Sequence, residues 1–555
     1  MLIQLHCIPG NAVLREEASE DAGRFYGDVL QDQNFWLGML QIFNTVNRHR
    51  WGQYTDLCPR RTGCTSVGST RAWIGAGEID LTWQGTQGVR GMFTDNQKLP
   101  ITTTSAAAAD HYNHALTEYF DYRLSAGKSA KAALTADPEF VLGHCLRGYF
   151  NMLIGSTEFY AGAREHLDRA LLGVAAVSRR EQLHVRALEA WLAGDTRLSC
   201  RLWADIVAEQ PQDLLALRLH HFASFWRGRQ RDLRALPAQA LGAWDRGMPG
   251  YGNVLGMLAF GLEECGDYPA AEALGRQAVS LNPDDMWALH AVAHVLEMQG
   301  RLEEGLSWLN QPADHWIDRN PFRGHLWWHK ALYFLELGDY EQVLDLYDQC
   351  IHDEKSIFYL DIQNQASLLL RLDYLGVEVT RRWAELADFL ETRLDDHVLT
   401  FTDIHTMMAL AAAGREPAMA RFIESLQATA ACSLPDQAAI IQNVTIPLCT
   451  AIAAQRRGEQ AAALQTILDI EPDLAVVGAS HAQRDIFELL RLEAAIGAQQ
   501  YQRARALLSE RTILKPNSLG SWQKYARVLE ALGETRASAR ARGRVEQFVT
   551  ALPCA

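Results

Sequence analysis

Hydrophobic and polar positions follow the period of amphipathic helices along most of the chain, from about Ser105 to Val549. Glycines end similar helical segments at spacings of 34, 38, 34 and 38 residues: Gly194, Gly228, Gly266, Gly300 and Gly338. A glycine just past a helix supplies the left-handed backbone that stops it. A period of this length is typical of a repeat made of two helices.

The clearest repeat unit lies around Gly266. One helix stops at this glycine, a second starts after a short turn near Tyr268, and Pro283 stops the second helix. Similar breakers contain Pro138 and Pro211, and the three prolines are 73 and 72 residues apart, which is two repeats each time. Looser copies extend to the C-terminus, with glycines at Gly414, Gly458, Gly497 and Gly533. We predict an all-α protein, a right-handed α-solenoid of tetratricopeptide-like helix pairs over residues 98–550.

The first 97 residues mix glycine, threonine and polar residues and carry no repeat punctuation. We predict that residues 1–97 are a weakly ordered N-terminal extension. Met92 offers an alternative start, which would make residues 1–91 an artefact of gene annotation. N-terminal sequencing of the native protein would refute that hypothesis by finding Met1.

The composition of the chain argues against two classes of binding partner, nucleic acids and membranes. The net charge of −15 over 555 residues opposes nonspecific binding to nucleic acid, so we expect no nucleic-acid partner. No stretch reaches about 18 uninterrupted apolar residues, and we expect no membrane partner. The ten cysteines are scattered without a Cys-x-x-Cys pair, which favours a reducing cytoplasmic location over a disulfide scaffold.

Counting backward from each glycine assigns the residues of a first helix to its two sides. In a typical repeat the residues eleven, eight, seven and four before the glycine pack against neighbouring helices. For Gly266 and Gly300 all eight are apolar: Leu255, Leu258, Ala259, Leu262, Leu289, Val292, Ala293 and Leu296. At about 100° per residue, positions thirteen, ten, nine and six before the glycine point toward the concave surface instead.

Histidine recurs at those concave positions. Six residues in four repeats share this property: His184, His290, His294, His325, His329 and His405. Four of them form two His-x-x-x-His pairs in adjacent repeats, and imidazoles four residues apart on a helix can share one ligand. We therefore predict a histidine-rich concave groove that binds a ligand.

The two pairs also form a candidate metal site. Its ligands would be His290, His294, His325 and His329, holding a divalent ion such as zinc, manganese or iron. If such an ion activates water, Glu297 or Asp403 would serve as the general base. The competing interpretation is that the histidines have a structural role or are polar filler on a solvated face.

Three further residues are candidates for the groove. Trp328 lies ten residues before Gly338 and is predicted to face it, and Arg484 and Asp485 cluster at a predicted helix start. Imidazoles, a carboxylate and indole faces suit a small polar or aromatic molecule or a short peptide. They do not suit an acidic C-terminal peptide, which would need lysine, arginine and asparagine at these positions.

From about Leu99 to Pro516 the chain resembles the tetratricopeptide repeat protein 38 family. The segments that carry the resemblance are Leu99–Ser105, Arg179–Val185, Trp287 with His290, His294, Glu297 and Met298, His325 with Trp328, His329 and Tyr333, Asp396–His397, Phe401, Asp403, His405, Gln483–Asp485 and Lys515–Ser518. The resemblance implies a helical solenoid and no settled activity.

Three functions remain open from the sequence. The first is a binding module whose groove holds a small molecule or short peptide. The second is a metal-dependent enzyme of the hydrolase type that uses the same histidines. The third is a protein-interaction scaffold without pocket chemistry.

Overall fold

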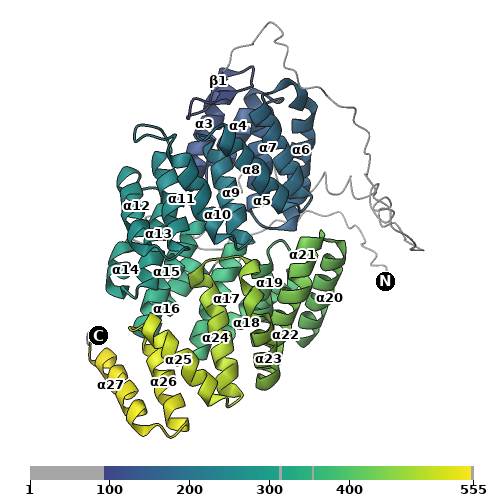
Figure 1. The fold of residues 1–555 in the computed structure, drawn as a ribbon. Coiled ribbons are helices and arrows are strands. Elements are labelled where there is room, and N and C mark those ends of the chain that lie inside the picture. Colours follow the sequence, from purple (N-terminus) through teal and green to yellow (C-terminus); the bar gives the residue numbers. More distant parts are fainter. Residues whose placement is uncertain (1–92, 312–315, 353–355, 552–555) are drawn as a thin grey trace, which may run out of the picture. The chain divides into compact units, whose positions relative to one another are not determined.

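The computed structural model describes residues 93–311, 316–352 and 356–551. These residues are helical except for loops and one small antiparallel pair, in which β1 (Phe93–Thr94) lies against β2 (Pro100–Ile101) (Figure 1). The predicted all-α, helix-pair solenoid is confirmed. Residues 1–92 of the predicted N-terminal extension lie outside the described residues.

The helices are arranged as successive pairs (Figure 1). The first helices are α3 (Ala106–Phe120), α5 (Val141–Leu153), α7 (Arg179–Leu192), α9 (Leu214–Trp226), α11 (Tyr251–Glu263), α13 (Met286–Met298), α15 (Phe322–Leu337), α17 (Tyr359–Tyr374), α19 (Thr400–Ala412), α22 (Ile446–Arg456), α24 (His481–Gly497) and α26 (Leu519–Ala531). The second helices are α4 (Ala126–Ala136), α6 (Tyr160–Gly173), α8 (Thr196–Glu209), α10 (Gln230–Leu241), α12 (Tyr268–Leu281), α14 (Leu302–Trp308), α16 (Tyr340–Leu346), α18 (Thr380–Leu390), α20 (Glu416–Cys432), α23 (Gln460–Ile470), α25 (Tyr501–Leu514) and α27 (Thr535–Ala551). Each first helix packs against its partner, and successive first helices pack against one another, as α11 does on α13 and α15 does on α17.

Short segments complete the set. They are α21 (Pro435–Ile440), the 3-10 turns η1 (Thr157–Phe159), η2 (Val174–Ala176), η4 (Glu391–Arg393) and η6 (Glu471–Val477), and the π-helical segments η3 (Tyr347–Ile351) and η5 (Ile441–Thr445). Together α21, η5 and α22 form one continuous helix, Pro435–Arg456, which is long and apolar enough to cross a membrane by length and composition alone. Half of its most apolar window is buried in the protein, and α22 packs on α19 and α23, as a core helix does.

The predicted glycine punctuation is confirmed at eight positions, where φ lies between 62° and 87°: Gly194, Gly228, Gly266, Gly300, Gly338, Gly414, Gly458 and Gly533. The prediction for Gly497 is wrong, because this glycine is the last residue of α24 and Gln499 takes the left-handed conformation instead. Gly376 ends α17 in the same way and was missed, since the spacing search stopped at Gly338 and resumed at Gly414.

The described residues begin at Phe93, before the predicted solenoid boundary at residue 98. Asp95 accepts hydrogen bonds from the backbone N–H groups of Gln97 and Leu99, and its other carboxylate oxygen lies 2.7 Å from Arg180 of α7. This buried ion pair attaches residues 93–97 to the array.

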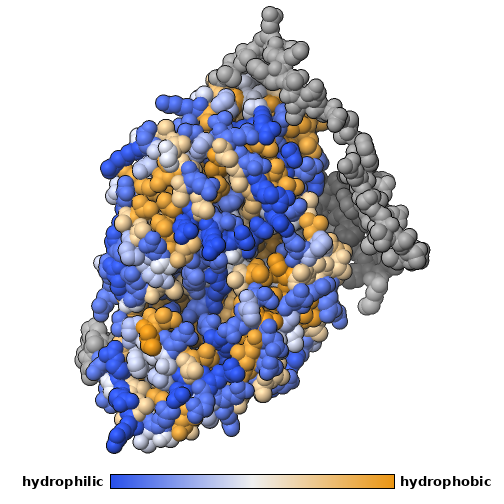
Figure 2. Space-filling model, viewed as in Figure 1, coloured by the Kyte–Doolittle hydropathy of each residue, from blue (hydrophilic) through white to orange (hydrophobic). Residues whose placement is uncertain are grey.

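Late repeats lie against early ones. Helix α24 contacts α13 and α17, and α26 contacts α15. The backbone N–H of His481 donates to Glu264 at 2.9 Å, and Asn517 donates to the carbonyl of Gly300 at 2.9 Å. These contacts cover the inner faces of the central first helices. An outer face of the protein is a mosaic of hydrophilic and hydrophobic residues (Figure 2), while the main apolar cluster lies between the helices.

Candidate functional site

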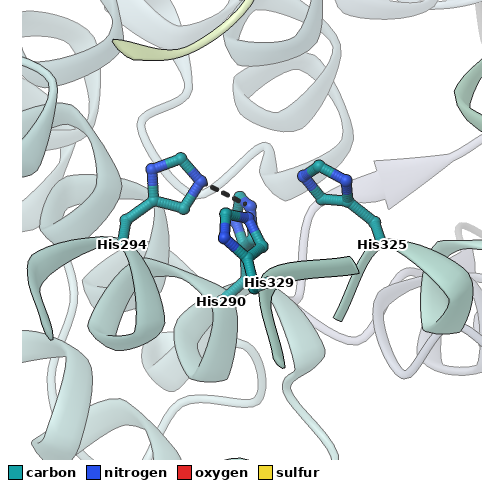
Figure 3. A group of neighbouring side chains, drawn as sticks. All are labelled: His290, His294, His325 and His329. Carbon is teal, nitrogen blue, oxygen red and sulfur yellow. Dashed lines mark hydrogen bonds between the residues drawn. The ribbon is translucent and has the colours of Figure 1, made fainter. Parts of the chain in front are cut away.

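Four of the six predicted histidines converge between two first helices (Figure 3). Helix α13 supplies His290 and His294, and α15 supplies His325 and His329. One ring nitrogen of each lies within 4.8 Å of one ring nitrogen of every other. The closest pair is Nε2 of His290 and Nε2 of His294, at 2.8 Å. We call these four residues the imidazole cluster.

The imidazole cluster is buried, so the predicted solvated groove is wrong. Its four side chains are between 0% and 3% exposed. The reason is the packing of α24 and α26 on the central repeats, which closes over the positions that an open superhelix would leave in water. Burial also excludes the interpretation of the histidines as filler on a solvated face, whereas a structural role is compatible with it.

Side chains around the cluster bind the outward nitrogens of its rings. Glu297 Oε2 lies 2.9 Å from His329 Nδ1, and Asn364 Oδ1 lies 2.8 Å from His325 Nδ1. Glu263 Oε2 lies 3.5 Å from His294 Nδ1. Because these partners face Nδ1, they favour the tautomers of His294, His325 and His329 that leave Nε2 with its lone pair. The 2.8 Å hydrogen bond between His294 Nε2 and His290 Nε2 then has its proton on His290 Nε2.

Three buried ring nitrogens of the cluster lack a hydrogen bond, although Glu263 Oε2 lies 3.5 Å from one of them, His294 Nδ1. Among the described residues, His290 Nδ1, His294 Nδ1 and His329 Nε2 are buried without a hydrogen bond. A buried polar atom left unpaired costs on the order of 1–3 kcal/mol. A cluster that served only core packing would gain from apolar side chains at these positions.

The electrostatics keep the imidazoles neutral. Burial, aided by the neighbouring rings, holds the pKa of His290 and His325 well below its ordinary value. Burial lowers the pKa of His294 to about 4 despite the opposing effect of Glu297, and it raises the pKa of Glu263 to about 8. Neutral imidazole is the form that binds metal ions.

Arg484 and Asp485, both predicted to reach the ligand, lie one contact further out. Arg484 NH2 lies 3.6 Å from Glu264, which neighbours Glu263 in the sequence. Asp485 is held by Arg511 through two hydrogen bonds of 2.6 and 2.9 Å, and Lys515 lies 3.6 Å from Asp485 and 3.9 Å from Glu297. The two residues therefore belong to an ion network that surrounds the cluster.

Trp328 does reach the cluster. Its indole stacks on the His325 ring, with centroids 5.1 Å apart and planes 10° apart, and the Arg371 guanidinium lies 5.6 Å from the indole centroid. The indole is 1% exposed, so it is a wall of the cluster and does not face a groove.

His184 lies apart from the cluster, in a hydrogen-bonded network of the N-terminal repeats. Its Nδ1 is 3.2 Å from the Tyr149 hydroxyl, and its Nε2 is 3.1 Å from Asp213. Asp213 also pairs with Arg180 at 2.6 Å. Both ring nitrogens of His184 thus have partners.

His405 and Asp403 also lie apart, on α19. His405 Nδ1 donates to the carbonyl of Phe401 at 2.7 Å, and Asp403 lies 2.8 Å from His397 Nδ1. Neither belongs to a group of metal-ligating atoms among the described residues. The structure does not bring Asp403 to the position of a base for the cluster.

A cavity of about 120 Å³ adjoins the cluster, and His290 and His325 form part of its wall. Sequence reasoning missed its one guanidinium, Arg218 of α9. The register contained the signal, since Arg218 lies ten residues before Gly228, as His290 does before Gly300. Glu263 was missed similarly, although it precedes Gly266 by three residues as Glu297 precedes Gly300.

No family model matches this chain. Among solved structures, the chain is similar to a human IFIT1 dimer with m7Gppp-AAAA, at 12% identity and a TM-score of 0.33, covering 81% of this chain and 91% of that one. It is also similar to Naa15/Naa10 bound to HypK-THB, at 13% identity and a TM-score of 0.23, covering 80% and 70%. Both likenesses are remote, and the RNA and protein partners belong to those proteins. The resemblance to the tetratricopeptide repeat protein 38 family stays a prediction.

Proposed function

We propose that this solenoid is a metal-binding protein that holds a divalent transition-metal ion in the imidazole cluster, beside a cavity for a small molecule. One observation carries the proposal: four neutral, buried imidazoles from two adjacent repeats present ring nitrogens within 4.8 Å of one another. Cytoplasmic location remains part of the proposal.

The spacing of the nitrogens supports this role. Four nitrogens bound tetrahedrally at about 2.0–2.1 Å from an ion are separated by about 3.3 Å. His290 Nε2 and His294 Nε2 are 2.8 Å apart, and the four nitrogens all lie within 4.8 Å of one another, so ligation requires side-chain rotations that bring these separations to about 3.3 Å. Imidazole ligands suit zinc, copper, iron and nickel.

The surroundings resemble the outer shell of metal sites. Metal-bound histidines usually donate their second N–H to a carboxylate or carbonyl oxygen, which fixes the ring. Glu297 and Asn364 accept from His329 and His325 in this way. Glu297 also brings negative charge toward an ion that neutral imidazoles alone do not balance.

The same geometry disfavours the predicted hydrolase roles. Glu297 Oε2 is engaged by His329, which makes it a positioning residue, and Asp403 of α19 pairs with His397 of the loop before that helix. A protein-interaction scaffold would not need an enclosed cluster of imidazoles. The proposal therefore combines the metal ion of the enzyme hypothesis with the small-molecule binding of the binding-module hypothesis.

Metal titration of the full chain, purified without a histidine tag, tests the proposal. We expect one Co²⁺ or Zn²⁺ per chain, visible absorption typical of nitrogen-bound Co²⁺, and about 2.7 kcal/mol of added stability at a free ion concentration of 100 Kd. The double variant His290→Ala with His329→Ala is expected to lose all three.

The matched control is His184→Ala, which removes a buried histidine from the same register position. It should keep full metal stoichiometry, with circular dichroism confirming the helical fold of every variant. Absence of stoichiometric metal in the wild-type protein, or equal binding by the double variant, would overturn the proposal.

A further inference from the structure

The cavity beside the imidazole cluster has the chemistry of a site for a small aromatic anion. Its volume of about 120 Å³ is close to that of cavities that hold one benzene ring. Its walls include Phe222, Phe225, Trp287, Phe322 and Tyr359, which come from the four helices α9, α13, α15 and α17. Such walls favour one flat apolar ring.

One positive charge faces this apolar space. The Arg218 guanidinium lies 4.2 Å from the centroid of the Trp287 ring and donates a hydrogen bond to the Tyr122 hydroxyl. No carboxylate of the described residues forms an ion pair with it, although its side chain is half-buried. A guanidinium in such surroundings is matched by a carboxylate that it can bind through two parallel N–H groups.

Asp285 is a candidate ion-pair partner for Arg218, but both of its carboxylate oxygens accept hydrogen bonds from other residues. Asp285 lines a small adjoining space with Arg218, but its Oδ1 accepts from the backbone N–H groups of Trp287 and Ala288 at the start of α13. Its Oδ2 accepts from Asn253 at 3.0 Å. The N–H groups of Arg218 are therefore not used by this carboxylate.

Two polar atoms of the cavity-lining residues are also unsatisfied. Among the described residues, the Trp287 indole N–H and His290 Nδ1 are buried without a hydrogen-bond partner. When Nε2 of His290 binds a metal ion, the ring proton must lie on Nδ1, which then becomes a donor. Metal binding would thus add a hydrogen-bond donor for an anion in the cavity.

We infer that the cavity binds a single-ring aromatic carboxylate, with its carboxylate at Arg218 and its ring between the aromatic walls, next to the metal ion. This inference deepens the proposed function, because His290 serves both sites. Binding of the two ligands is expected to be mutually reinforcing, since linkage is reciprocal.

Benzoate is the probe, titrated by calorimetry into the full chain after chelation and again after loading with Zn²⁺. We expect saturable binding of one benzoate per chain, tighter in the loaded protein. Benzamide, which has the same shape without the charge, should bind at least tenfold more weakly. The variant Arg218→Met should lose at least tenfold in benzoate affinity, whereas Arg229→Met, at an exposed position of the next loop, should not change it.

The outcomes separate the two proposals. Benzoate binding to the chelated protein with no stoichiometric Zn²⁺ uptake would refute the metal site and keep the anion site. Stoichiometric Zn²⁺ without benzoate binding at millimolar concentration would refute the anion site alone. Equal affinities for benzoate and benzamide, or an unchanged affinity in a folded Arg218→Met protein, would also overturn the inference.

Discussion

His184 and His290 occupy the same place in two repeats, ten residues before the closing glycine, and both are buried, yet their surroundings differ. Around His184 the N-terminal repeats provide a hydroxyl and a carboxylate, and both ring nitrogens are satisfied. Around His290 the central repeats provide three other imidazoles. Register fixes which way a side chain points, while the partners contributed by neighbouring repeats decide whether it is structural or a ligand.

The largest expected effect tests the structural side of this comparison. Asp213→Ala removes the carboxylate shared by Arg180 and His184 and leaves a buried guanidinium with only Asp95. Because breaking a buried pair strands a charge, we expect a loss of about 3–5 kcal/mol in the free energy of unfolding. Denaturant unfolding measures it.

Metal stoichiometry of the folded Asp213→Ala protein should stay unchanged. A stability loss below about 1 kcal/mol, or a loss of metal, would show that the two histidine environments are not distinct in the way described.

His220 is buried but does not belong to the imidazole cluster, so it tests the effect of burial alone. Burial lowers the pKa of His220 to about 4, partly opposed by Asp232 and aided by Arg227. Below pH 6.5 His220 is protonated in the unfolded chain, whereas in the folded protein it is protonated only below about pH 4. The free energy of unfolding therefore falls as the pH drops from 6.5 to 4 and levels off below pH 4. For this one residue the change between pH 7 and pH 5 is about 2 kcal/mol.

His220→Leu should make the stability of the protein less dependent on pH by this amount in unfolding titrations at pH 7, 6 and 5. An unchanged pH dependence would mean that burial alone does not keep this histidine neutral.

The smallest expected effect tests the outer partners of the cluster. Glu297→Gln keeps an acceptor for His329 but removes the negative charge. We expect metal affinity to fall about tenfold. Competition with a chromophoric chelator measures it, and Glu303→Gln, an exposed glutamate of α14, is the matched control. Equal affinities in the two variants would remove Glu297 from the site.

Much of the fold could be predicted because its signals are local. A glycine that ends a helix and an apolar residue that packs on the next helix are set by nearby sequence, and the register arithmetic correctly joined His290 with His329 across two repeats. The closure by α24 and α26 could not be predicted in this way, because contacts such as His481 with Glu264 join residues 217 positions apart. The predicted groove failed for that reason.

The residues missed in the site illustrate a second limit. Arg218 and Glu263 occupy the register positions that His290 and Glu297 occupy in the repeat ending at Gly300, so the signal for both was present in the sequence. Asn364 had no such signal, since it lies in the repeat that ends at Gly376, which the glycine spacing had skipped. The glycine that ends that repeat was nevertheless recognisable, because Gly376 lies 38 residues after Gly338 and 38 before Gly414.

The order in which the ribosome makes these elements has a consequence for assembly. The two helices that carry the imidazoles are complete by Leu337, whereas the segments that cover them, beginning at His481 and Asn517, emerge more than a hundred residues later. N-terminal parts of a chain fold first during synthesis, so the four imidazoles are in place before the segments that cover them exist. If the imidazole cluster binds a metal ion as proposed, an ion that enters at that stage would be enclosed when the last repeats fold, and metal loading would be coupled in time to completion of the polypeptide.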